Sequence, residues 1–176
     1  MSRMVRENLS SGLQERVWFA RWSLRELQQR QQAGENRGPL LALRAAVISH
    51  SYSVLIGLSR FALQQAAVPL SPDALTLAAL EQAAEEHGVV SPQVELLRQA
   101  RSQVQDKVCW LEGEFRALFA ANGLSRRPQP PQVMELRAAQ DSADDVLAAG
   151  DLQRLQQMIE RVEALLTLAS GQLEEC

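Results

Sequence analysis

The fold of this chain is decided by residues 40–68, LLALRAAVISHSYSVLIGLSRFALQQAAV, the longest apolar-rich run in the sequence. Its hydrophobic residues recur every three or four positions, which predicts a helix buried on a broad face. Pro39 can occupy the first turn, and Pro69 ends the helix by pushing Val68 out of the helical conformation. The uncharged segment 45–59 is shorter than the roughly 20 residues of a membrane span. We therefore expect this helix to lie at the centre of a protein core.

One line along this helix consists of small residues around a single imidazole: Ala46, His50, Ser53 and Gly57. Small side chains allow a neighbouring helix to approach closely, so we predict the tightest helix crossing here. Glycine inside a helix costs about 1 kcal/mol relative to alanine. Gly57 fits a position where packing needs the space.

The composition predicts a single all-α domain. The chain has 176 residues, of which 46% are hydrophobic and 22% charged, ordinary values for a globular protein. Helix-forming residues dominate over β-branched and aromatic ones. The net charge is −3, so no basic surface for nucleic acid is indicated. The N-terminus lacks the apolar core of a signal peptide, and we expect a soluble, cytoplasmic protein that does not bind membranes.

Working outward from the central stretch, we predict a single up-and-down helical bundle of four long helices and one short helix. Ser71 and Ser91, each followed by proline, are typical helix starts. Leu124–Pro131 is a short proline-rich connection, and Gln132–Gln140 has only a weak helical pattern. Besides the central helix, the predicted helices span Val5–Gln32, Pro72–His87, Pro92–Ala121 and Asp151–Glu174.

Arg44 and His50 are the candidate catalytic residues. A single histidine on an apolar helix face can act as a general base, but more often it is hydrogen-bonded within a core. An arginine followed by histidine at this spacing resembles the motif of HEPN domains, which implies a degenerate RNA-cleaving or nucleotide-binding function. In a straight helix, however, six residues place the two side chains about 120° apart.

Metal and cofactor chemistry have no sequence basis. A di-iron bundle needs Glu-x-x-His motifs, but Val47 and Ala84 stand three residues before the only histidines, His50 and His87. No zinc motif and no glycine-rich phosphate loop is present. We therefore predict no metal site and no cofactor. We interpret Cys109 as a buried thiol and Cys176 as a terminal thiol. We interpret the four aspartates Asp141, Asp144, Asp145 and Asp151 as a solvated acidic turn.

Trp18 and Trp22 are one helical turn apart and alternate with Arg21 and Arg25. Such an aromatic and basic strip can bind a partner, although tryptophans at this spacing more commonly pack in a core. We consider three hypotheses: a non-enzymatic protein that binds itself as a homodimer or binds another protein, the HEPN-like domain, and a small-ligand binder around His50. The candidate binding residues are Trp18, Trp22, Arg21, Arg25, His50 and Tyr52.

Two segments resemble a family of small bacterial proteins, the domain-of-unknown-function family numbered 6586. They are Glu15–Leu24, ERVWFARWSL, and Leu43–Leu58, LRAAVISHSYSVLIGL. The first is similar to that family's first-helix pattern of a basic residue, aromatic residues and alanine. The second is similar to its second-helix pattern of Arg-x-Ala, His-x-Tyr and Gly-Leu. The resemblance implies a bacterial helical bundle, and it implies no activity or catalytic residue.

Overall fold

The computed structural model describes the backbone of residues 3–120, 147 and 150–174, and the side chains of residues 11–120, 147 and 150–170. Within these ranges the protein is all-α, with six helices and no strand. The helices are α1 (Arg3–Gln32), α2 (Arg37–Gln65), α3 (Leu77–Glu86), α4 (Pro92–Ser102), α5 (Lys107–Ala117) and α6 (Asp151–Glu174).

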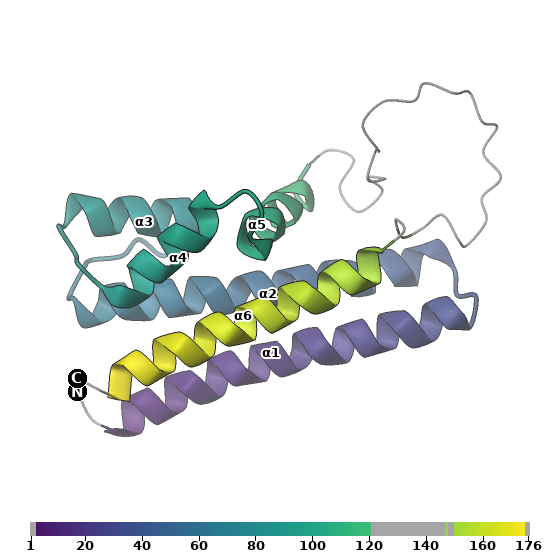
Figure 1. Ribbon diagram of the computed structural model, residues 1–176, viewed down its shortest axis with the longest axis horizontal. Coiled ribbons are helices and arrows are strands. Elements are labelled where there is room, and N and C mark those ends of the chain that lie inside the picture. Colours follow the sequence, from purple (N-terminus) through teal and green to yellow (C-terminus); the bar gives the residue numbers. More distant parts are fainter. Residues whose placement is uncertain (1–2, 121–146, 148–149, 175–176) are drawn as a thin grey trace.

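Three long helices, α1, α2 and α6, lie side by side, and the shorter α3, α4 and α5 cover the other side of α2 (Figure 1). Both α2 and α6 run in the direction opposite to α1. The central helix α2 contacts all five of the other helices. Its predicted position at the centre of the bundle is therefore confirmed.

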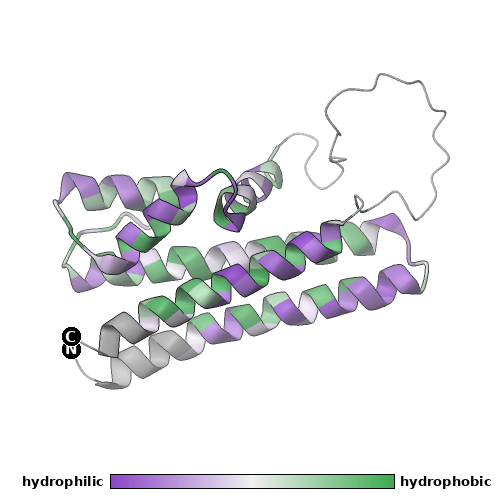
Figure 2. Cartoon of the chain, in the orientation of Figure 1, coloured by the Kyte–Doolittle hydropathy of each residue, from purple (hydrophilic) through white to green (hydrophobic). Residues whose placement is uncertain are grey.

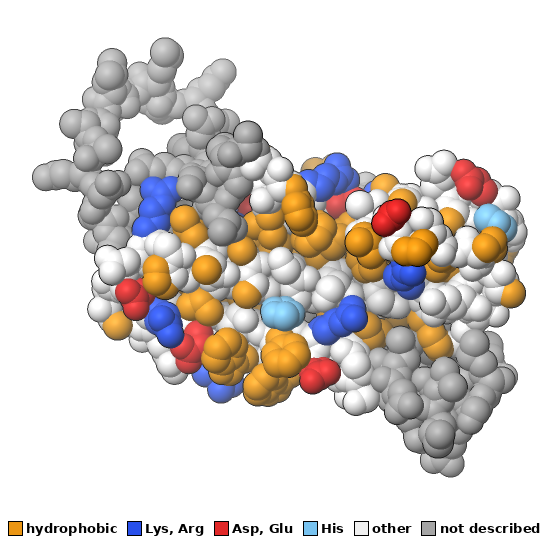
Figure 3. All heavy atoms as spheres, turned by 180° about the vertical axis from the view of Figure 1, so that it is seen from behind, with side chains coloured by type: hydrophobic (Ala, Val, Ile, Leu, Met, Phe, Trp, Pro, Cys, Tyr) orange, Lys and Arg blue, Asp and Glu red, His pale blue; other side chains and the backbone are white. Residues whose placement is uncertain are grey.

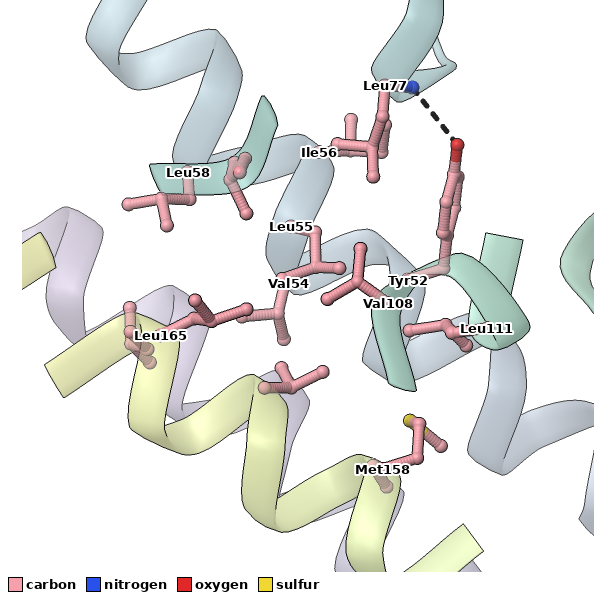
Figure 4. Close-up of a cluster of buried hydrophobic side chains, with 14 of the residues drawn as sticks. Tyr52, Val54, Leu55, Ile56, Leu58, Leu77, Val108, Leu111, Met158 and Leu165 are labelled. Atoms are coloured by element: carbon pink, nitrogen blue, oxygen red, sulfur yellow. Dashed lines mark hydrogen bonds between the residues drawn. The ribbon is translucent and has the colours of Figure 1, made fainter. Parts of the chain in front are cut away.

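The core forms around α2, which carries hydrophobic stretches on both sides of its paler midpoint in Figure 2. Val54 and Leu55 are fully buried there, and Leu165 of α6 and Leu111 of α5 belong to the same cluster (Figure 4). Each fully buried aliphatic side chain of this kind contributes about 1.5–3 kcal/mol by leaving water. Burial on several sides at once explains why the whole stretch is apolar rather than a single stripe.

Gly57 marks the closest approach of α1 to α2, as the small-residue line predicted. A Cβ atom built on Gly57 would lie 2.5 Å from Cδ2 of Leu13 and 3.4 Å from Nη1 of Arg16. Leu13 is itself 3% exposed, so its side chain has little room to move aside. The absence of a side chain at position 57 therefore sets the distance between the two helices.

The central helix begins before the predicted start and also ends earlier, at Gln65 rather than Val68. Ala67 adopts a left-handed conformation with φ +58. The N–H of Val68 donates to the carbonyl of Leu63, and that of Ala67 to the carbonyl of Gln64, both at 3.0 Å. This is a Schellman motif, which stops the helix before the restriction imposed by the following proline applies.

The predicted start of the third helix at Pro72 is wrong. The Ser71 hydroxyl accepts from the Asp73 N–H at 3.2 Å, and the Ser71 carbonyl accepts from Ala74, so these residues form a turn. The cap is Thr76 instead, whose hydroxyl accepts from the N–H of Ala79 at 3.2 Å. A serine–proline pair can start a turn as well as a helix. In this protein, tertiary contacts favour the turn at Ser71–Pro72.

Tyr52 supplies one of those contacts. Its hydroxyl accepts a hydrogen bond from the N–H of Leu77, the first residue of α3, at 3.0 Å (Figure 4). Its ring stacks on Phe115 of α5 with centroids 4.1 Å apart. One buried side chain of α2 thus holds the start of α3 and the C-terminal end of α5.

The predicted long helix Pro92–Ala121 is broken between Ser102 and Lys107 into α4 and α5. Asp106 causes the break, because its carboxylate accepts from the N–H of Val108 at 2.9 Å and caps α5. Arg161 of α6 binds the same carboxylate, with Nη2 2.7 Å from Oδ2. The described part of the chain therefore forms three long and three short helices, not four long helices and one short one.

The last helix, Asp151–Glu174, has the predicted bounds. The proline-rich connection 124–131 and the weakly helical segment 132–140 lie outside the described residues. By length and composition, α2 contains a window that could cross a membrane, and 44% of that window is buried inside the bundle. The core helix of a bundle passes the same test, so this finding is weak evidence for a membrane span.

Candidate functional site

An exposed group of aromatic side chains lies where α1 meets α2. We define the aromatic face as Trp18, Phe19 and Trp22 of α1 together with His50 of α2. Trp18 and Phe19 meet edge to face with centroids 5.3 Å apart, and Phe19 lies 5.4 Å from the His50 ring. Figure 3 shows large hydrophobic side chains gathered beside a histidine near the middle of the view.

The two tryptophans are the largest exposed side chains on this face. Trp18 is 59% exposed and Trp22 is 45% exposed. Trp18 and Trp22 are exposed because the hydrophobic stripe of α1 faces the bundle and these two positions lie on the opposite side of the helix. That stripe comprises Leu13, Val17, Ala20, Leu24 and Leu27, each at most 7% exposed.

The two arginines of the predicted strip have different roles. Arg21 faces α6, where Nε and Nη2 donate to the two carboxylate oxygens of Glu163. The hydrogen bond that Arg21 donates to Glu163, together with the charge of Glu163, raises the pKa of Arg21. Arg25 is exposed and forms no ion pair with any residue in the described ranges. Arg21 therefore joins α1 to α6, and only Arg25 stays available beside the tryptophans.

His50 is half-buried at the edge of the aromatic face. Burial lowers the pKa of His50, and the nearby charge of Arg16 lowers it further. The Arg16 guanidinium is held in place because Nη1 donates to the Ser53 carbonyl at 2.9 Å. The imidazole is thus disfavoured in its charged form, and its ring packs against Phe19.

The space along Ala46, His50, Ser53 and Gly57 is filled. Side chains of α1 occupy it, with Leu13 against Gly57, Arg16 on the Ser53 carbonyl and Phe19 on the His50 ring. At these three positions the line is a helix-packing surface between α1 and α2.

Arg44 lies in a different part of the bundle from His50. Its Nε donates to Oδ2 of Asp151 at 2.7 Å and its Nη2 to Oδ1 at 3.1 Å, while Nη2 also lies 3.0 Å from Oε2 of Glu114. Burial lowers the pKa of Arg44, but the hydrogen bond and charge of Asp151, with those of Glu114, outweigh it and raise the pKa. The guanidinium joins α2, α5 and α6, and it does not share a site with His50.

Tyr52, a further candidate binding residue, is buried. It is 2% exposed, and burial raises the pKa of its hydroxyl, against the opposing effect of the Leu77 hydrogen bond. Its role within the described structure is to hold α3 and α5, so it does not belong to the aromatic face.

A second cluster of charges lies among the short helices. Arg101 donates from Nε to Glu112 at 2.9 Å and also binds Glu81, and Arg116 binds Glu112 at 2.7 Å. A small cavity opens between α2, α3 and α4, lined by Ser59, Leu77, Glu81, Val94, Leu97, Arg98 and Arg101. The charged residues in it are paired with one another, so the cluster is built to join the three short helices.

Metal ligands are not grouped anywhere in the described ranges, where no three His, Cys, Asp or Glu side chains could hold an ion together. Cys109 is a free, partly buried thiol. Asp151 is engaged by Arg44, and the other acidic residues of the predicted turn, Asp141, Asp144 and Asp145, lie outside the described residues, as does Cys176.

Phe19 is the residue of this face that sequence reasoning missed. Its signal was its position between two tryptophans, but only the tertiary structure brings His50 against it. No protein-family model, curated protein or solved structure matches the chain. The resemblance to family 6586 therefore stays a prediction.

Proposed function

We propose that this protein is a non-enzymatic helical bundle that acts through protein–protein contact at the aromatic face. The observation that carries the proposal is the exposure of Trp18 and Trp22, at 59% and 45%, on one side of one helix. Tryptophan is enriched at the energetic centres of interfaces, because it buries a large rigid surface and offers one N–H donor. Leaving two such side chains in water is costly unless a partner covers them.

The aromatic face is also held rigidly. A rigid face favours binding because little conformational entropy is lost on association. Leu13 against Gly57 and Arg16 on the Ser53 carbonyl attach α1 to α2. Arg21 attaches the same helix to Glu163 of α6. The aromatic side chains are thus presented from a helix that is fixed on two sides.

We further infer that the protein works in the cytoplasm and does not span a membrane. The support is that α2, the one helix among the described residues apolar enough for a span, contacts the five other helices described. Extraction of the natural protein tests this inference. We expect it in the supernatant after cell lysis without detergent, and recovery only in the detergent fraction would contradict it.

Site-specific photocrosslinking tests the binding function. The full chain carries a photoreactive phenylalanine analogue at position 18, and a matched control carries it at position 75, since Leu75 is 58% exposed and far from the aromatic face in sequence. We expect discrete adducts in native cells only from position 18, and we expect Trp22→Ser to remove them. Equal labelling from both positions, or adducts that survive Trp22→Ser, would overturn the proposal.

A further inference from the structure

We propose that the partner is a second copy of this chain, and that the two copies pack α1 against α1 in antiparallel orientation about a two-fold axis midway between Trp18 and Trp22. This inference rests on the proposed function, since it uses the same tryptophans. It adds the identity of the partner and the orientation in which the partner binds.

The outer side of α1 carries four residues in a self-complementary order. Glu15, Trp18, Trp22 and Arg25 are all exposed, and they fall within an arc of about 80° on a helix of 3.6 residues per turn. The two charges lie outside the two tryptophans, one at each end. An acidic end and a basic end thus flank an aromatic centre on one helix face.

A two-fold axis at position 20 places each residue opposite the one at the same distance on the other side of the axis. Trp18 then meets the partner's Trp22, and Glu15 meets the partner's Arg25. The symmetry repeats each pair, giving two tryptophan contacts and two opposite-charge pairs from four residues per copy. Such an isologous arrangement is the commonest form of homodimer.

The reverse orientation is disfavoured by charge. With the two helices parallel and in register, Glu15 would face Glu15 and Arg25 would face Arg25, and both contacts repel. Opposite-charge pairs across an interface select orientation more than they add affinity. The charge order along α1 therefore selects the antiparallel dimer.

Glu15 and Arg25 are also free to make these contacts. Neither forms an ion pair with another residue in the described part of the chain. The neighbouring charges are engaged, because Arg21 binds Glu163 and Arg30 pairs with Glu26 at 3.4 Å. Among the side chains that the structure describes, the two charges on the tryptophan side thus have no ion-pair partner.

Sedimentation equilibrium of the full chain is the first measurement, over about 1 to 100 μM, the range in which a small interface dissociates. We expect a reversible monomer–dimer equilibrium. Trp18→Ser should weaken it by about 30-fold, as for a residue at the centre of an interface. Leu75→Ser, at a comparably exposed position elsewhere, should leave it unchanged.

Charge reversal tests the orientation. Glu15→Arg or Arg25→Glu alone creates two repulsive pairs and should weaken the homodimer by at least about tenfold. The double variant Glu15→Arg/Arg25→Glu restores both attractive pairs. Mixing the two single variants should give a heterodimer tighter than either homodimer, because the variant with two arginines meets the variant with two glutamates.

The outcomes separate this inference from the proposed function. A strictly monomeric chain whose position 18 still crosslinks to a different protein would overturn the dimer and leave the proposed function standing. A dimer that persists in Trp18→Ser/Trp22→Ser would overturn the α1 interface. A dimer lost in Trp18→Ser but with no rescue in the charge-reversed mixture would overturn the antiparallel arrangement.

Discussion

Arg44 Nε donates a hydrogen bond to Oδ2 of Asp151 at 2.7 Å, which joins the central helix to the first residue of α6, 107 positions later in the chain. The Asp151 side chain is 2% exposed and that of Arg44 is 14% exposed. An acidic residue at the start of a helix is also favoured by the helix dipole. The pair positions the last helix against the core, which is a structural role and not a reactive one.

We expect Arg44→Ala to destabilise the protein by about 3 kcal/mol, because it leaves the buried carboxylate of Asp151 without its counter-charge. Urea denaturation followed by circular dichroism measures the change. Arg30→Ala, at an arginine whose side chain is 47% exposed, serves as the control and should change stability by less than about 0.5 kcal/mol. An unchanged midpoint in Arg44→Ala would show that the buried pair does not stabilise the bundle.

The contact between Gly57 and Leu13 predicts that Gly57→Ala destabilises the protein when Leu13 is present and stabilises it when Leu13 is replaced by alanine. Gly57→Ala should cost about 1–2 kcal/mol in the natural sequence, because overpacking exceeds the gain in helix propensity. In a Leu13→Ala background the 2.5 Å contact is gone and only the ordinary 3.4 Å contact with Arg16 Nη1 remains, so the same substitution should stabilise by up to about 1 kcal/mol. Thermal unfolding of the four proteins measures this cycle. Stabilisation by Gly57→Ala in both backgrounds would show that the crossing is looser than the structure indicates.

The left-handed conformation of Ala67 predicts that Ala67→Gly stabilises the protein. Three helices end in the same hydrogen-bonding pattern, with Gly34 and Gly88 in the left-handed position of two and Ala67 in that of the third. Glycine adopts this conformation without the steric cost that alanine bears, so Ala67→Gly should add about 1 kcal/mol. Ala66→Gly, at φ −79, is the matched control and should destabilise. If the two variants shift the unfolding midpoint equally, strain at position 67 is not the cause.

His50 predicts a loss of stability in weak acid. The pKa of His50 in the folded protein lies below the ordinary value of 6.5 for histidine, so between these two values the unfolded chain binds more protons than the folded one. The free energy of unfolding should therefore fall as the pH drops from about 6.5 to the folded pKa and then level off. Subtracting the profile of His50→Gln isolates this contribution. A natural protein that gains stability relative to His50→Gln on acidification would contradict the assignment.

Glu112 contributes in a separate, lower pH window, which keeps the two effects distinguishable. Burial raises the pKa of this carboxyl group, but hydrogen bonds from Arg101 and Arg116 outweigh it, so the pKa is lowered from its ordinary value of 4.5. Stability supplied by Glu112 is present above that value and is lost as the pH falls through the folded pKa. His50→Gln should not alter that second loss.

The candidate site was predictable in part. The spacing of Trp18 and Trp22 marked them as a pair, but the same spacing occurs in buried stripes, and the exposure of a helix face depends on how much of the helix is covered. Arg21 and Arg25 look equivalent in the sequence, and only the position of Glu163 on α6 separates them. The contact of Phe19 with His50 joins two helices and has no local signal.

The sequence by itself determined that the chain is helical, that residues 40–68 form its centre, that Gly57 is a close helix crossing and that the last helix spans Asp151–Glu174. These features follow from periodicity, propensity and prolines, which act over a few residues. Only the tertiary structure decided that Pro92–Ala121 is two helices, because the bond from Arg161 to Asp106 links positions 55 residues apart. It also decided which side of α1 stays in water, since that depends on where α2 and α6 pack.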